Sequence, residues 1–299
     1  MSRGAEPGRW IGYIEVIGAA ALWGSSGIFS VHLFATGLPP ESVALLRPVL
    51  GLVFLGAFFQ ARGGLRVSAR ALVLLAGLGG LLTGVFQLAY QFAVAEVGVP
   101  TTVALVYLAP AFVVAASGPL LGEWPTPMRV GLAVVSVTGV WMTVFGARNA
   151  EAGTSLTGVL WGALAGASYA GYTLFGRHAS LRFGSPATAV YSAAGACLLL
   201  AVVLPVAGMG VQLPVGASTW ALLALYALLT IAVATALFYD GLGRIEADRA
   251  SIVTTAEPLV AAVLATTLLD QRLTTIGWLG LGLVVVSVSG AYASGTRNG

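Results

Sequence analysis

Ten apolar segments dominate the pattern of hydrophobic and polar positions along the chain. They run over residues 14–34, 41–60, 71–94, 99–120, 129–146, 156–177, 186–206, 219–242, 250–269 and 274–293. Most are about 20 residues long, which as α-helix is enough to cross a hydrocarbon core ~30 Å thick. The connections between them are too short for a globular domain. The pattern therefore predicts an all-α integral membrane protein with ten transmembrane helices.

The charged positions between these segments predict how the chain is oriented. The chain has 14 positively charged side chains, and all of them are arginine. If the N-terminus is cytoplasmic, Arg148 and Arg272 lie outside and Arg47 lies within a span. The others lie on the cytoplasmic side, at Arg3, Arg9, Arg62, Arg66, Arg70, Arg129, Arg177, Arg182, Arg244, Arg249 and Arg297. Because short cytoplasmic loops carry the excess of arginine, we expect both termini in the cytoplasm of a multi-pass protein of the bacterial inner (plasma) membrane.

The second half of the sequence partly repeats the first. Residues 131–139, GLAVVSVTG, return as GLVVVSVSG at 282–290, and Pro110 and Pro258 fall at matching points of the fourth and ninth segments. Each half holds five spans, and an odd number forces the second half to enter the membrane from the opposite side. The repeat predicts two inverted five-helix units, residues 1–147 and 148–299, around a central cavity. This arrangement is typical of secondary transporters.

The composition limits which kinds of molecule the protein is expected to bind. Charged residues make up 8% of the chain and hydrophobic residues 58%, whereas soluble domains have about 25% charged residues. The arginines are scattered, so we expect no nucleic-acid partner. There is no lysine and no GxxxxGK[ST] loop, which excludes ATP binding through a P-loop. With one cysteine, Cys197, no intrachain disulfide and no cysteine metal site can form. We also expect no metal and no cofactor. The expected partners are membrane lipid and a small-molecule substrate, and a monomer is sufficient.

Three ionisable residues within the spans are candidate charge or coupling sites, because burying such groups in a bilayer is costly. Arg47 either binds a substrate carboxylate bidentately or ties neighbouring helices together. Asp240 precedes Arg244 by four residues, which favours a stabilising helix pair over a proton site. Glu257 has no basic neighbour in its own helix, and structural and functional interpretations stay open. Pro258 frees a backbone carbonyl group near Thr254.

Several short motifs, in this order and spacing, resemble the EamA-type family of the drug/metabolite transporter superfamily. They are Leu22-Trp23-Gly24-Ser25-Ser26, Arg47, Pro110 followed by Gly122-Glu123, and Glu257-Pro258. Within that superfamily the chain is most similar to aromatic amino acid exporters. Asp270-Gln271 departs from the Gly-Glu that the family pattern and the first half have. The resemblance implies that spans one, three, four, six and eight line the central cavity.

The deep aromatic residues on those spans are the candidate substrate-binding residues, together with a few polar ones. The predicted set is Trp23, Ser26, Gln87, Tyr90, Tyr107, Trp161, Tyr169, Tyr172, Tyr239 and Thr254. Such a wall suits an amphipathic solute with a flat apolar part, although any one of these rings could instead serve helix packing. By default, Trp10, Tyr13, Trp124, Trp220, Trp278 and Tyr292 are expected at the membrane interfaces.

Together these features predict export of aromatic or other bulky neutral amino acids by alternating access. The cavity has no cluster of basic residues to hold a phosphate group. A multidrug or lipophilic-cation exporter is the alternative, and a passive pore or scramblase is the second. An intramembrane enzyme would need the serine pattern at Gly24-Ser25-Ser26-Gly27 and His178 as a base. We expect no enzyme, because His178 lies at a cytoplasmic helix end and matches His32 in the repeat.

Overall fold

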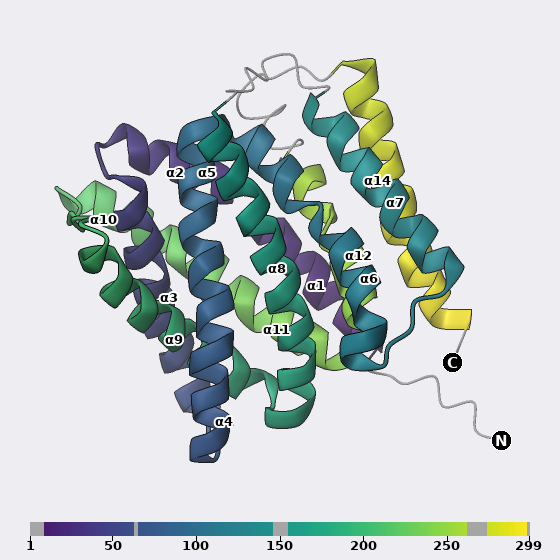
Figure 1. Ribbon diagram of the computed structural model, residues 1–299, viewed down its shortest axis with the longest axis horizontal. Helices are drawn as coiled ribbons and strands as arrows, with labels where there is room; N and C mark the ends of the chain where they lie inside the picture. The colour runs from purple at the N-terminus through teal and green to yellow at the C-terminus, as the bar shows by residue number, and fades with distance from the viewer. Residues whose placement is uncertain (1–8, 63–64, 146–154, 262–273, 298–299) are drawn as a thin grey trace.

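The computed structural model describes residues 9–62, 65–145, 155–261 and 274–297, and its regular elements there are all helices (Figure 1). In chain order these are α1 (Arg9–Trp23), α2 (Ser26–Ala35), α3 (Pro40–Arg62), α4 (Ala69–Leu74), η1 (Leu75–Gly79), α5 (Gly80–Val106), α6 (Ala109–Leu121), α7 (Pro127–Phe145), α8 (Leu156–Phe183), α9 (Ser185–Val206), α10 (Ala217–Ala227), η2 (Leu228–Val233), α11 (Ala234–Arg244), α12 (Ala247–Val253) and α14 (Thr275–Arg297). The two η segments are π-helical turns within longer helices.

Six stretches of helix in the described residues are long and apolar enough to cross a membrane. They are Trp10–Ala35, Pro40–Gln60, Ala69–Val99, Thr101–Leu121, Ser185–Val206 and Ala217–Arg244. Residues Pro127–Thr143 and Thr275–Ala291 form shorter apolar helices, and α8 is long but richer in glycine and tyrosine. The predicted multi-pass membrane protein is confirmed. The count of ten spans and the side on which the termini lie stay predictions.

Three of the predicted spans contain a break in their helix. The first is interrupted between α1 and α2 at Gly24-Ser25, the fourth between α5 and α6 after Val106, and the ninth after Val253. The last two breaks precede Pro110 and Pro258, because a proline ring clashes with the carbonyl group one turn earlier. Broken backbone is tolerated at membrane depth where it is enclosed by protein or lines a cavity.

A sharp turn at Gly98 separates the third span from the fourth, although both belong to α5. Gly98 has a φ of +74°, a left-handed conformation that glycine adopts without a steric penalty. Pro100 follows, and the residue before a proline avoids the helical region. The sequence pattern places the boundary between apolar segments at this point, and the structure agrees.

The helix pairs that join the two halves come in matched sets. Helix α5 packs on α8 while α1 packs on α11, and α3 packs on η2 while α9 packs on η1. In both π-helical contacts a glycine makes the close approach: Gly51 faces Ile231, and Gly195 faces Ala76. These are the pairings that two inverted repeats would form. The inverted relation itself stays a prediction, and its boundary near residue 147 lies outside the described residues.

Helices α7 and α14 form a pair at one side of the molecule (Figure 1). A methyl group placed on Gly139 would lie 2.9 Å from Cβ of Leu283, and one placed on Gly290 would lie 2.6 Å from Cδ2 of Leu132. Leu132 and Leu283 hold the same place in the repeated nine-residue segments, as do Gly139 and Gly290. The contact is therefore reciprocal, because the leucine of each segment packs on the glycine of the other.

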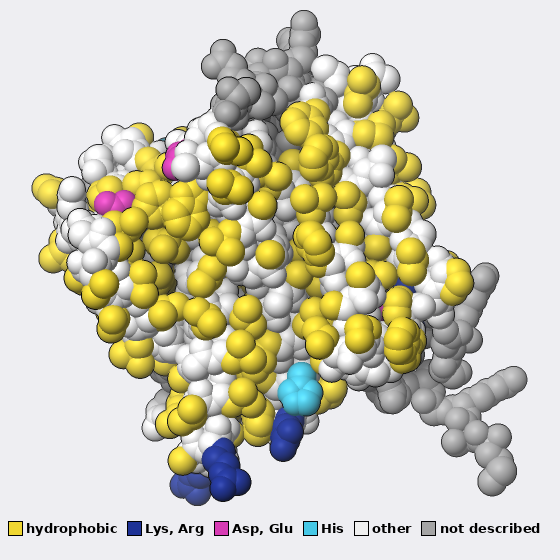
Figure 2. All heavy atoms as spheres, viewed as in Figure 1, with side chains coloured by type: hydrophobic (Ala, Val, Ile, Leu, Met, Phe, Trp, Pro, Cys, Tyr) yellow, Lys and Arg dark blue, Asp and Glu magenta, His cyan; other side chains and the backbone are white. Residues whose placement is uncertain are grey.

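The surface divides into an apolar body and a basic end. Figure 2 shows hydrophobic side chains over the visible face, with the basic side chains gathered at the end where α4 lies. Trp10, Trp124, Trp220 and Trp278 are exposed, as expected for interfacial residues. Tyr13 is different, because it is only 3% exposed and donates a hydrogen bond to the carbonyl oxygen of Ala291, 3.0 Å away. The interfacial position of Tyr13 stays a prediction.

Candidate functional site

A cavity lies among the broken helices at the centre of the fold. Its volume is about 60 Å³. This is far below the ~300–1,000 Å³ of pockets that hold drug-sized ligands. The walls come from both halves of the chain. Nine of the predicted site residues line it: Trp23, Ser26, Arg47, Gln87, Tyr90, Tyr169, Tyr172, Tyr239 and Glu257. The structure thus brings these side chains together, and their role in binding stays a prediction.

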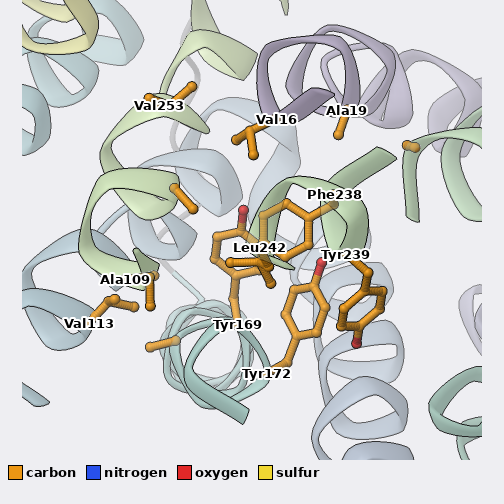
Figure 3. Close-up of a cluster of buried hydrophobic side chains, with 14 of the residues drawn as sticks. Val16, Ala19, Ala109, Val113, Tyr169, Tyr172, Phe238, Tyr239, Leu242 and Val253 are labelled. Carbon is orange, nitrogen blue, oxygen red and sulfur yellow. The ribbon is translucent and has the colours of Figure 1, made fainter. Parts of the chain in front are cut away.

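Aromatic rings from α8 and α11 form a continuous wall of the cavity. Figure 3 shows Tyr169 and Tyr172 on α8 turned toward Phe238 and Tyr239 on α11. The ring centroids of Tyr169 and Tyr172 are 5.4 Å apart, and those of Tyr172 and Tyr239 are 5.8 Å apart at 87°. Residues three apart share one face of a helix, which explains how α8 presents two rings side by side.

Trp23 extends this wall from the end of α1. Its ring lies edge-on to Tyr169 at 6.3 Å, and its indole Nε1 donates to the carbonyl oxygen of Thr230, 2.8 Å away. The π-helical turn η2 contains Thr230, and such turns leave backbone carbonyl groups free to accept other donors. The tryptophan is therefore fixed across the boundary between the two halves.

Arg47 is buried and bonded to three elements besides its own. Its Nε donates to Oγ1 of Thr230 at 3.0 Å, and its Nη1 donates to Oε1 of Gln87 at 3.2 Å. The guanidinium group also lies 4.1 Å from the ring centroid of Tyr226, a distance typical of cation–π contact. Arg47 therefore ties helices together, as one of the two interpretations predicted, and at the same time lines the cavity.

Glu257 lies on the opposite half of the chain and also faces the cavity. The hydroxyl group of Tyr107 donates to Oε2 of Glu257 at 2.6 Å and to the carbonyl oxygen of Thr254 at 2.9 Å. The carbonyl group near the proline break is thus satisfied by a side chain from the matching break of the fourth span. The contact joins the two breaks directly.

Four of the predicted site residues do not line the cavity. Tyr107 and Thr254 lie behind its wall and support Glu257, and Trp161 stacks on Phe92 at 5.2 Å. Asp240 is half-buried near the end of α11. The structure corrects the predicted helix pair of Asp240 with Arg244, because Arg244 instead forms its ion pair with Glu15 of α1. The packing of α1 on α11 brings that carboxylate within reach.

The sequence interpretation missed several lining residues. Phe86 lies between Tyr90 and Tyr169, at 5.9 and 5.6 Å, and its position four residues before Tyr90 was the signal that it shares that face. The other missed residues are small hydroxyl-bearing ones, Thr83, Ser192, Thr230 and Thr235. Serine and threonine are common throughout this chain, so nothing in the pattern distinguishes these four.

Ion pairs between the halves lie at the end where α12 begins. Arg129 of α7 bonds to Asp248 at 2.9 Å, and Arg177 of α8 bonds to Glu123 at 2.8 Å. Oε2 of Glu123 also accepts the backbone N–H of Ala247 at 3.1 Å. Burial raises the pKa of the Asp248 carboxyl, and the Arg129 guanidinium opposes that shift. These ion pairs tie the two halves of the chain together where α12 begins.

Tyr226 of α10 makes a second set of contacts between the two halves. It is fully buried, stacks on Phe29 at 5.0 Å and carries Arg47 on its ring. Its hydroxyl group lies 3.0 Å from that of Ser30 and accepts from Nε2 of Gln91 at 3.4 Å. Both sets of contacts thus join the first half of the chain to the second.

A helical membrane fold with a cavity between its two halves is typical of membrane transporters. The chain belongs to the EamA-like transporter family, whose sequence profile matches residues 10–145 and again residues 156–293. This confirms the family that the sequence resembles. The preference for aromatic amino acid exporters within it is not tested by the match.

Two relatives are similar over nearly their whole length. One, described as an uncharacterized inner membrane transporter, YicL, of Salmonella typhimurium, is 25% identical over 93% of each chain. The other, an uncharacterized transporter, YwfM, of Bacillus subtilis, is 27% identical over 92% of this chain and 93% of its own. A crystal structure with a TM-score of 0.79 and 22% identity covers 97% of this chain and 99% of its own, and it supports the fold alone.

The serine and histidine of the enzyme alternative are not brought together. Ser26 is buried at the cavity wall, whereas His178 is exposed near the end of α8. A serine nucleophile needs its base within hydrogen-bond reach. The relatives are described as transporters, and the absence of enzymatic activity stays an expectation.

Proposed function

We propose that this transporter exports aromatic or other bulky neutral amino acids from the bacterial cytoplasm by alternating access, without ATP. The observation that carries the proposal is the wall formed by Trp23, Phe86, Tyr169 and Tyr172 around one cavity. Such rings stack on a flat apolar side chain. Polar groups at Arg47 and Glu257 supply partners for the charged head of the solute.

The contacts between the halves at two separate places support alternating access. A carrier exposes its site to one side at a time, so the contacts at one end must break while those at the other hold. Because the present cavity is far too narrow for an aromatic amino acid, binding requires the walls to move apart. The inverted repeats would supply two conformations of similar energy.

Counterflow in proteoliposomes tests this function. Purified protein is reconstituted with unlabelled phenylalanine or tryptophan inside, and uptake of the labelled amino acid is followed. We expect saturable uptake that competes with other bulky neutral amino acids and not with glutamate or sugar phosphates. Uptake that rises linearly with concentration would favour a passive pore or scramblase instead.

A lipophilic cation is the second candidate substrate. Glu257 faces an aromatic cavity, and a carboxylate beside aromatic rings binds cations through charge and cation–π contact. In that case tetraphenylphosphonium would show saturable counterflow while phenylalanine and tryptophan would not. The same vesicles therefore separate the two candidates.

A further inference from the structure

Arg47 and Glu257 are the charged side chains that line the central cavity. Among the described residues, neither forms an ion pair. The buried charges outside the cavity are different, because they are paired across or along helices: Arg129 with Asp248, Arg177 with Glu123, and Arg249 with Glu246. The cavity thus holds one positive and one negative side chain that form no ion pair with each other.

The contacts that these two side chains do make orient them and leave one atom of each uncommitted. Arg47 uses Nε and Nη1 for Thr230 and Gln87, and Glu257 uses Oε2 for Tyr107. Within the described part of the chain, Nη2 of Arg47 and Oε1 of Glu257 take part in no hydrogen bond. Neutral partners offset only part of the cost of burying a charge, and an opposite charge is needed for the rest.

We propose that Arg47 binds the carboxylate of an α-amino acid and that Glu257 binds its ammonium group. The proposal rests on the amino acid export proposed above and assigns the two charges of the substrate to two side chains. A zwitterion completes an ion pair at both residues. A solute with only one charge leaves the other side chain unpaired, so the site selects against amines and acids that have the same aromatic ring.

Charge analogues of tryptophan test the assignment on the unchanged protein. Tryptophan methyl ester keeps the ammonium group and loses the carboxylate, whereas N-acetyltryptophan keeps the carboxylate and loses the ammonium group. We expect each to compete with labelled tryptophan in counterflow on the order of tenfold or more weakly than tryptophan itself, because each gives up one charged hydrogen bond. Equal competition by all three compounds would overturn the assignment.

Two variants then tell the charges apart. In Arg47→Gln, competition by tryptophan weakens by on the order of tenfold while competition by the methyl ester changes little. The preference for tryptophan over the ester is therefore lost. In Glu257→Gln, the preference over N-acetyltryptophan collapses instead. Arg182→Gln and Glu41→Gln remove the same charges from positions outside the cavity and should leave both preferences unchanged.

The outcomes separate this inference from the proposed function. If both variants weaken competition by all three compounds by the same factor, Arg47 and Glu257 act on the fold and the assignment is wrong, although amino acid transport stands. If the unchanged protein carries tetraphenylphosphonium and not tryptophan, the function and the assignment both fail. If a variant does not fold, competition on the unchanged protein decides.

Discussion

Tyr107 shows how a residue outside the cavity can shape it. Its hydroxyl group is the hydrogen-bond donor at both Glu257 and the carbonyl group of Thr254, and its ring is buried. A carboxylate in a low-dielectric interior depends on such donors. The side chain that faces the solute is therefore oriented by one that does not.

We expect Tyr107→Phe to weaken tryptophan counterflow and to lower the thermal stability of the protein. The change leaves a buried carboxylate oxygen and a carbonyl oxygen with one donor fewer, which costs about 1–3 kcal/mol. Trp161→Phe is the matched control, because Trp161 stacks on Phe92 away from the cavity. Half-saturation and unfolding temperature are measured for both. Equal effects of the two changes would contradict the prediction.

A site residue could be predicted from the sequence when its side chain differs from the others in the same apolar segment. Arg47 and Glu257 stand out because charges are rare in apolar segments, and the deep aromatics stand out by size. Thr230 and Ser192 do not, because their place at the cavity depends on a π-helical turn and on the packing of helices distant in sequence. Asp240 was misread because the sequence spacing favoured Arg244, while the tertiary fold placed Glu15 nearer to that arginine.

At the scale of elements, the glycines determine how close helices come. The apolar segments predicted the helices well, because hydrophobic length is a local property, and Pro110 and Pro258 marked two of the breaks. The close approach of η1 and α9 was not predictable, because it depends on which glycine meets which backbone. The approach continues at Gly80, the first residue of α5, where a methyl group would lie 2.6 Å from the backbone of Gly195.

Gly80→Ala should therefore destabilise the protein by about 1–3 kcal/mol, because overpacking against backbone forces the two helices apart. Gly77→Ala, one turn away, is the control, since no atom lies within 4 Å of the added methyl group. That change should be neutral, or slightly stabilising because alanine favours helix. Thermal unfolding in detergent measures both, and a neutral Gly80→Ala would show that the contact of Gly80 with α9 is looser than described.

At the scale of the whole molecule, the orientation in the membrane can be tested directly. In a Cys197→Ser background, a cysteine at Val215 should react with a membrane-impermeant thiol reagent in intact cells, because residues 207–216 are expected outside. A cysteine at Leu181 should react only after permeabilisation. Both positions are open to the reagent, at 90% and 60% exposed. The reverse labelling pattern would overturn the predicted orientation.

The ion pairs between the halves should be coupled in energy. Asp248→Asn leaves Arg129 partly unpaired in a buried position, and breaking one partner of such a pair costs about 3–5 kcal/mol. Replacing both, as Arg129→Met with Asp248→Leu, should cost less than the sum of the single changes. Thermal unfolding of the four proteins gives this coupling, and additive losses would mean that the two side chains do not stabilise each other.

The reciprocal contact of α7 with α14 has a consequence for how such a chain can be assembled. When Gly139 receives Leu283 and Gly290 receives Leu132, each segment offers the surface that the other needs. A surface of this kind is self-complementary, as at the interface of a symmetric homodimer. A half-length chain carrying the segment GLAVVSVTG would already be able to pair with a second copy of itself. In a membrane that pairing requires the two copies to be inserted in opposite directions.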